Sequence, residues 1–230
     1  MNKTQTEAKD TPKRTRAKLF DFDYILFDIG KALAIVPGLI WMRPKWRYET
    51  ENAKKRIRGG AILIFNHAGF VDPIAAQFAV WYRRQHFVAT KELFHTPFLR
   101  WLFGVFHCIE VDRENFSMNT FRDITEHLKG GKIVSIFPEG HINTTSDTSV
   151  TPFKSGVVMM ALRSGMPVVP VYMKMQDKWY RRAVFVIGDT IDLRSKYGAL
   201  PSMKVIADIT ADLHNKELEL GRLTGTAIQK

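Results

Sequence analysis

An uninterrupted apolar run, Ala61–Phe65, constrains the fold of this chain most strongly. A short run of this kind predicts a buried β-strand. His67 follows directly after the run, and Asp72 comes five residues later. The histidine is therefore expected where a strand ends and the chain turns, which is where α/β proteins place their reactive groups.

The rest of the chain alternates apolar runs with amphipathic stretches, which predicts one α/β domain over residues 49–225. We expect a mixed, mainly parallel sheet flanked by helices. The single cysteine, Cys108, excludes an intramolecular disulfide and is interpreted as a packing residue. Strands are expected at 61–65, 86–90, 107–111, 132–137, 168–174 and 183–189, and helices at 73–84, 97–104, 116–129, 154–164 and 202–219.

The N-terminal part differs in composition from this domain. Residues 1–17 are polar and charged, which predicts a disordered basic tail. Residues 18–48 are predicted to form an amphipathic helical segment in the membrane interface, as a helical pair hinged near Pro37. Trp41 and Trp46 would then lie at the depth of the lipid headgroups.

Two alternatives to an interfacial segment are open. The segment could instead pack on the protein's own core. Residues 24–42 could also span a membrane, which is disfavoured because Asp28 and Lys31 would lie in hydrocarbon.

The formal net charge of +11 calls for an anionic partner. Basic groups at 13–18, 43–47 and 54–58 flank the apolar N-terminal stretch. This placement favours an anionic membrane surface over nucleic acid, because basic residues beside a membrane-binding segment attract lipid headgroups. Each group could also be an ordinary solvated surface.

Several short blocks follow the histidine motif in a fixed order. A second apolar strand ends in Phe137–Gly140, with the sequence FPEG. The other blocks are Lys91–Leu93, Ile109–Arg113, Phe153–Gly156 and Val168–Val171. Over about residues 60–175, the NHxxxxD and FPEG motifs in this order resemble the glycerolipid acyltransferase family, whose best-known members are the 1-acylglycerol-3-phosphate acyltransferases.

The residues of the histidine motif suit acyl transfer from a thioester to an alcohol. His67 is the candidate general base that takes the alcohol proton, and Asp72 would fix its tautomer and stabilise the imidazolium. In the resembled family these two positions have those roles. The structural alternative is a turn histidine followed by Asp72 as the N-cap of a helix that begins at Pro73.

The resemblance also implies substrate-binding residues. Lys91 and Arg113 stand at positions for a phosphate group, although either could be a surface cation. Glu139 would orient backbone donors or acceptor hydroxyls rather than act as an acid, and Gly140 would let the backbone approach a ligand. Asn66 is included in the same set.

The chain departs from the family pattern after the FPEG block. The family usually continues with Thr-Arg-Ser, whose arginine binds phosphate, whereas this chain has Ile142 at that position. Lys154 is the candidate substitute, because it is expected near a helix start. The acceptor could accordingly be a lyso-lipid or amino-acid lipid other than lysophosphatidic acid.

The apolar stretch 93–106 is predicted to line the acyl tunnel or its membrane mouth, with plain core packing as the alternative. The expected donor is an acyl-CoA or an acyl-ACP, with no cofactor and no metal. The expected partners are the phospholipid membrane, at its cytoplasmic face, and a lyso-lipid acceptor, and no nucleic acid is expected. The rival outside enzymes is a non-catalytic basic membrane-binding protein of the same fold.

Overall fold

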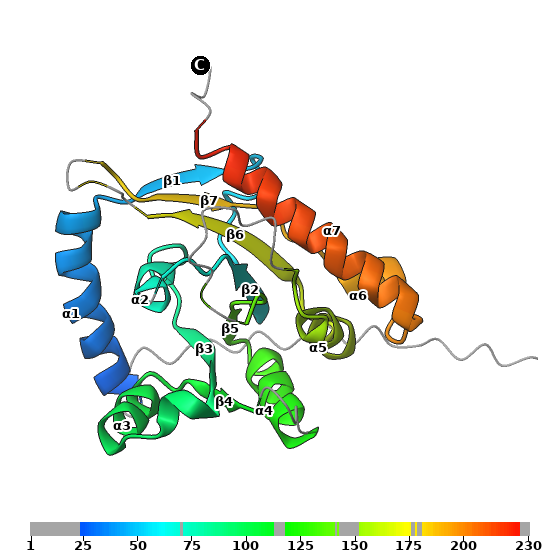
Figure 1. Cartoon of the computed structure of the whole chain (residues 1–230), viewed down its shortest axis with the longest axis horizontal. Helices are drawn as coiled ribbons and strands as arrows, with labels where there is room; N and C mark the ends of the chain where they lie inside the picture. The colour runs from blue at the N-terminus through cyan, green and yellow to red at the C-terminus, as the bar shows by residue number, and fades with distance from the viewer. Residues whose placement is uncertain are drawn as a thin grey trace, which may run out of the picture.

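The computed structural model describes residues 24–69, 71–112, 118–140, 142, 152–175, 178 and 181–225. Its strands form one seven-stranded sheet in the order β1-β7-β6-β2-β5-β3-β4 (Figure 1). Every neighbouring pair is parallel except β6 and β7. The strands are β1 Lys45–Tyr48, β2 Ala61–Phe65, β3 Gln85–Thr90, β4 Ile109–Val111, β5 Ile133–Ile136, β6 Val168–Lys174 and β7 Val184–Ile187.

Helices cover both faces of the sheet. One face carries α1 and α2, and the other carries α4, α5 and α7, as Figure 1 shows. The helices are α1 Ile25–Met42, α2 Asp72–Ala76, the 3₁₀ helix η2 Lys91–Phe94, α3 Pro97–Val105, α4 Met118–Lys129, α5 Gly156–Ser164, α6 Leu193–Tyr197 and α7 Met203–Arg222. The predicted α/β class with a mixed, mainly parallel sheet is confirmed.

The central strand β2 explains why its sequence is apolar at every position. All five residues are fully buried. Ile62 and Ile64 belong to the core beneath α4, α5 and α7, whereas Leu63 and Phe65 belong to the core beneath α2. A strand covered on both faces has no position for a polar residue until it ends.

Tertiary contacts correct the predicted helix at 73–84 and the predicted place of Trp46. The helix expected at 73–84 ends at Ala76, and turns follow at residues 77–82. Trp46 Nε1 donates to the backbone oxygen of Phe78 at 2.9 Å, which is the acceptor that a continued helix would need. Trp46 therefore lies in strand β1 against the protein interior, not at headgroup depth.

Cys108 agrees with its interpretation as a packing residue. It lies half-buried against the core on the α2 side of the sheet. Burial raises the pKa of its thiol to about 12, which keeps it protonated and weakly nucleophilic at neutral pH.

The N-terminal helix α1 is one continuous helix and not a hinged pair. Pro37 lies inside it, on an exposed face. A proline removes one helical hydrogen bond, here the bond to the oxygen of Leu33, which is also exposed. The face of α1 turned to the domain packs closely, since a Cβ on Gly38 would come within 2.4 Å of the Phe78 ring. This packing offsets the lost bond.

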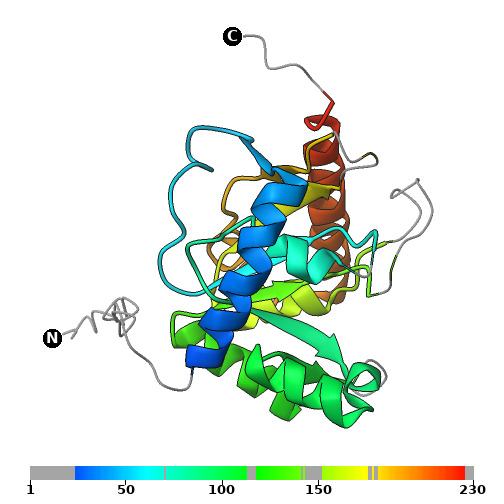
Figure 2. The same cartoon turned by 90° about the vertical axis from the view of Figure 1, so that its left-hand side faces the viewer.

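Polar contacts also tether α1 to the domain. Asp28 forms an ion pair with Arg84 at 2.6 Å, and the Lys31 amino group donates to the backbone oxygen of Arg83. The predicted alternative, that this segment packs on the protein's own core, is therefore correct for one face only. Figure 2 shows α1 lying along the side of the domain, beside α2.

The opposite face of α1 is an exposed apolar stripe. Its members recur at helical spacing and include Ile25, Ile29, Leu33, Val36 and Ile40, of which Ile40 is 75% exposed. By length and composition α1 could cross a membrane, and 17% of it is buried in the protein. An amphipathic helix fixed along a domain by one face can lie in a membrane interface with the other.

Candidate active site

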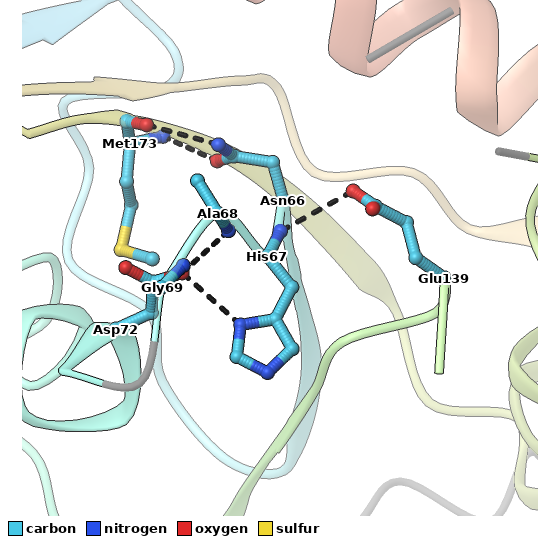
Figure 3. Close-up of polar contacts among 7 residues, drawn as sticks. All are labelled: Asn66, His67, Ala68, Gly69, Asp72, Glu139 and Met173. Atoms are coloured by element: carbon cyan, nitrogen blue, oxygen red, sulfur yellow. Dashed lines mark hydrogen bonds and ion pairs between the residues drawn. The ribbon is translucent and has the colours of Figure 1, made fainter. Parts of the chain in front are cut away.

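The His67 ring and the Asp72 carboxylate are in direct contact. His67 comes two residues after β2, and Asp72 is the first residue of α2. His67 Nδ1 lies 3.0 Å from Asp72 Oδ2. This contact places the ring proton on Nδ1, because a carboxylate only accepts. The other ring nitrogen, Nε2, points away from Asp72 in Figure 3 and is left to take a proton from a substrate.

Asp72 is held rigidly by the turn that it closes. Its Oδ2 atom also accepts from the backbone N–H groups of Ala68 at 2.6 Å and Gly69 at 2.7 Å (Figure 3). It makes no side-chain cap to α2, and Val71 occupies the N-cap position. The predicted N-cap role is therefore wrong. The carboxylate organises the histidine turn instead.

Asn66 anchors the end of β2 to the neighbouring strand β6. Its amide nitrogen donates to the Met173 oxygen at 3.0 Å, and its amide oxygen accepts from the Met173 N–H at 2.7 Å. Asn66 is buried, so both halves of the amide are used within the protein. The structure thus places this predicted substrate-binding residue in a positioning role for the next residue, His67.

Glu139 supports His67 from the other neighbouring strand. β5 pairs with β2, and Glu139 follows β5 by three residues. Its Oε1 atom accepts from the backbone N–H of His67 at 3.2 Å. Burial raises the pKa of Glu139, whereas the His67 N–H lowers it. The contact agrees with the prediction that Glu139 orients backbone donors.

Phe137 completes the surroundings of the histidine ring. Its ring stacks on His67 with centroids 4.3 Å apart. The side chain of His67 remains 16% exposed, so a substrate hydroxyl has access to it. Phe137 belongs to the FPEG block, and its place in that block is the one sequence signal that points to it.

Gly140 and Lys154 lie together beside Glu139. Gly140 has φ +76°, a left-handed conformation that side chains disfavour. A Cβ there would come within 3.0 Å of the Lys154 side chain. The Lys154 N–H donates to the Pro138 oxygen at 2.9 Å, two residues before α5 begins. The structure therefore places Lys154 at the FPEG turn and near a helix start, as the sequence predicts, and its role as a substitute phosphate ligand stays a prediction.

The other predicted phosphate ligands are placed differently. Lys91 follows β3 and forms an ion pair with Asp112 at 2.6 Å. Arg113 lies outside the described residues. Ile142 is 38% exposed, at the position where the family usually has arginine.

An apolar cavity of about 350 Å³ lies between α1 and α2, next to the histidine turn. Its lining includes Pro37 and Trp41 of α1, Ile74 of α2 and Val71, the neighbour of Asp72. The sequence predicted the acyl slot in a different part of the chain, the stretch 93–106, which does not line this cavity. Its helix α3 has no buried residue, and Phe98 and Trp101 are 64% and 58% exposed. Plain core packing is therefore wrong for α3.

Comparison with known proteins agrees with this geometry. Residues 46–174 match the family described as Acyltransferase. The 1-acyl-sn-glycerol-3-phosphate acyltransferase of Bacillus subtilis is 28% identical over 166 residues, which are 70% of this chain and 81% of the relative. The enzyme of the same name from Limnanthes douglasii is 35% identical over 176 residues, 73% of this chain and 59% of the relative.

The fold also has a solved counterpart. The crystal structure of the 1-acyl-sn-glycerophosphate (LPA) acyltransferase from Thermotoga maritima aligns with a TM-score of 0.59 at 20% identity. The alignment covers 90% of this chain and 82% of that protein. The family match spans more than half of the sequence and contains the histidine turn and the FPEG turn, so the chain belongs to the acyltransferase family.

Proposed function

We propose that this protein transfers a fatty acyl group from a thioester to the free hydroxyl of lysophosphatidic acid, giving phosphatidic acid. The observation that carries the proposal is the His67–Asp72 contact at a strand end, with Nε2 of His67 accessible. Relatives named for this reaction cover most of the chain and support the acceptor.

In this mechanism His67 Nε2 removes the proton of the acceptor hydroxyl as its oxygen attacks the thioester carbonyl. The hydroxyl oxygen forms the new ester bond, the carbon–sulfur bond breaks, and the thiolate leaves with a proton returned from His67. Asp72 stabilises the imidazolium that forms in between. Since the thioester is already activated, no acyl-enzyme is needed.

We propose binding places for the lipid parts of the substrates on the basis of the apolar cavity and the exposed apolar side chains. The acyl chain would enter the cavity between α1 and α2, which begins beside Asp72. Helices α1 and α3 lie on the same side of the molecule (Figure 1), so the exposed stripe of α1 and the exposed Phe98 and Trp101 of α3 would rest on the membrane. We place the protein at the cytoplasmic face, where acyl-CoA and acyl-ACP donors are found.

The test is an acyl-transfer assay with purified full-length protein on vesicles. Lysophosphatidic acid, other lyso-phospholipids and an amino-acid lipid serve as acceptors, each with acyl-CoA and with acyl-ACP. We expect the highest kcat/KM with lysophosphatidic acid. A higher value with an acceptor that lacks a phosphate monoester would refute the acceptor assignment and would follow from Ile142.

Two variants separate catalysis from binding. His67→Ala should lower kcat by at least 10²-fold, the usual contribution of a general base. His127→Ala, whose ring bonds within its own helix α4, is the matched control and should retain activity. Substantial turnover by folded His67→Ala would refute the base assignment, and no turnover by the wild type with any acceptor would favour a binding protein of the same fold.

A further inference from the structure

A second buried carboxyl group lies behind the active site, on helix α7. Glu217 is fully buried, and neither of its carboxyl oxygens has a hydrogen-bond partner among the described residues. Glu139 also has a carboxyl oxygen without a partner. Its Oε1 atom accepts from the His67 N–H, whereas its Oε2 atom is buried and has no hydrogen-bond partner among the described residues. The mechanism above does not use Glu217.

Two contacts bring this part of α7 to the FPEG turn. The ring of His214, three residues before Glu217, lies 4.8 Å from the ring of Phe153. The next residue, Lys154, lies against Gly140, the neighbour of Glu139.

Burial, and after it the negative charge of Glu139, raise the pKa of Glu217 to about 8. Burial also raises the pKa of Glu139, but less strongly, because the His67 backbone N–H and the His67 ring act in the opposite direction. Two buried carboxylates side by side cannot both ionise cheaply, so one proton is retained at neutral pH, on Glu217.

A protonated carboxyl group has one donor, and a buried donor requires an acceptor. Glu139 Oε2 is a buried acceptor with no hydrogen-bond partner among the described residues. The described groups near Glu217 offer few competitors. His214 stands three residues earlier on α7, Tyr172 of β6 lies against Gly221 one turn later, and strand β7 is entirely apolar.

We propose that Glu217 is a positioning residue for acyl transfer. Its protonated carboxyl donates a hydrogen bond to Glu139 Oε2, directly or through one buried water. Glu139 is thereby held as an anion whose Oε1 accepts from the His67 N–H, and the histidine backbone is fixed from behind. The catalytic part of this inference rests on the proposed function. Helix α7 lies beyond the residues that match the acyltransferase family.

The inference predicts a specific loss of activity at high pH. Above about pH 8 Glu217 ionises, and two adjacent buried carboxylates then repel each other. Glu139 would no longer receive the hydrogen bond that fixes it. Acyl transfer should therefore decline through this range for a reason that lies in α7 and not in the His67–Asp72 pair.

Two replacements of Glu217 test whether it acts as a hydrogen-bond donor or only packs in the core. Glu217→Gln keeps the shape and has an N–H donor that does not titrate, so kcat at pH 7 should stay within about threefold of the wild type and the decline above pH 8 should be reduced. Glu217→Leu removes the donor, and loss of one hydrogen bond to a charged group should lower kcat about tenfold with KM unchanged. Glu219→Gln, the same change at an exposed position of α7, is the matched control.

Stability against pH gives a readout that does not depend on activity. In the wild type the folded state keeps the Glu217 proton up to about pH 8, whereas the unfolded chain releases it near its ordinary value of 4.5. The folded state thus binds more protons in this window, and stability must fall as pH rises from 4.5 to 8. The Tm of Glu217→Gln relative to the wild type should accordingly increase between these pH values.

Two measurements on the folded protein complete the test. The infrared spectrum of the full-length wild type at pH 7 should contain a protonated carboxyl band that is absent in Glu217→Gln and disappears near pH 8. Amide hydrogen exchange in the peptide containing His67 should accelerate in Glu217→Leu and not in Glu217→Gln.

The contrary results are equally specific. An ionised Glu217 at pH 7, wild-type kcat and His67 exchange in Glu217→Leu, or a Glu217→Gln variant as impaired as Glu217→Leu would each overturn the inference. A wild type without acyltransferase activity that still shows the protonated band and the exchange difference would instead refute the proposed function while supporting the contact.

Discussion

Replacement of Asp72 by asparagine isolates the charge of the carboxylate from its shape. Asparagine can place its amide oxygen where Asp72 Oδ2 accepts from His67 Nδ1, Ala68 N and Gly69 N. The turn should therefore persist, while the negative charge beside the imidazole is lost. The expected effect is on the step in which His67 becomes positively charged.

The magnitude follows from the distance. With Nδ1 and Oδ2 3.0 Å apart, the centres of the two delocalised charges lie about 4 Å apart, and at an effective dielectric of about 20 they attract by about 4 kcal/mol. The imidazolium is only partly formed in the transition state, so about 2–4 kcal/mol should be lost. This corresponds to a decrease in kcat of roughly 30- to 1,000-fold.

The assay is steady-state acyl transfer to lysophosphatidic acid by the wild type, Asp72→Asn, His67→Ala and the double variant. Asp72 acts through His67 in this mechanism, so Asp72→Asn should cause no further loss in the His67→Ala background. Thermal unfolding of each variant checks that the fold is kept. A folded Asp72→Asn enzyme with kcat within threefold of the wild type, or additive losses in the double variant, would refute the reasoning.

Three further predictions address the frame of the site and the membrane surface. Asn66→Ala removes two buried hydrogen bonds to Met173 and should cost about 2 kcal/mol, seen as a Tm lower by about 4–8 °C; an unchanged Tm would contradict the anchoring role. Gly140→Ala forces a side chain into a left-handed conformation against Lys154 and should lower the free energy of unfolding in urea by about 1–2 kcal/mol, whereas Gly104→Ala, which has open space in α3, should not. Ile40→Glu on the exposed stripe of α1 should reduce co-sedimentation with anionic vesicles, while Leu200→Glu, exposed in the loop before α7, should have no effect; equal loss in both would exclude α1 as the membrane contact.

The sequence predicted six of the seven strands and the His67–Asp72 contact because these depend on local patterns, whereas β1 lies in the stretch 18–48 that was predicted to be helical. The apolar run of β2 can be satisfied only by burial on both faces, and the residues after it must then form the exposed strand end. The FPEG block follows a second such strand. Since the two strands are parallel neighbours, their ends bring Glu139 to the backbone of His67 without further assumptions.

Other features depend on contacts between segments far apart in the chain. Trp46 has an aromatic side chain suited to a membrane interface, yet it lies half-buried in an edge strand of the sheet and donates to the Phe78 oxygen. Pro37 normally interrupts a helix, yet α1 continues because the domain holds it on both sides of the proline. Lys91 lies at a position for a phosphate ligand, yet it pairs with Asp112.

The sequence by itself thus determined the α/β class, the position of the histidine turn and the kind of chemistry that it performs. Only the tertiary structure decided the role of Asn66, the place of α1 and the burial of Glu217 behind Glu139. The physical reason is that periodicity and turn chemistry are read from neighbouring residues, whereas the cost of burying a polar group is set by whatever the fold brings against it.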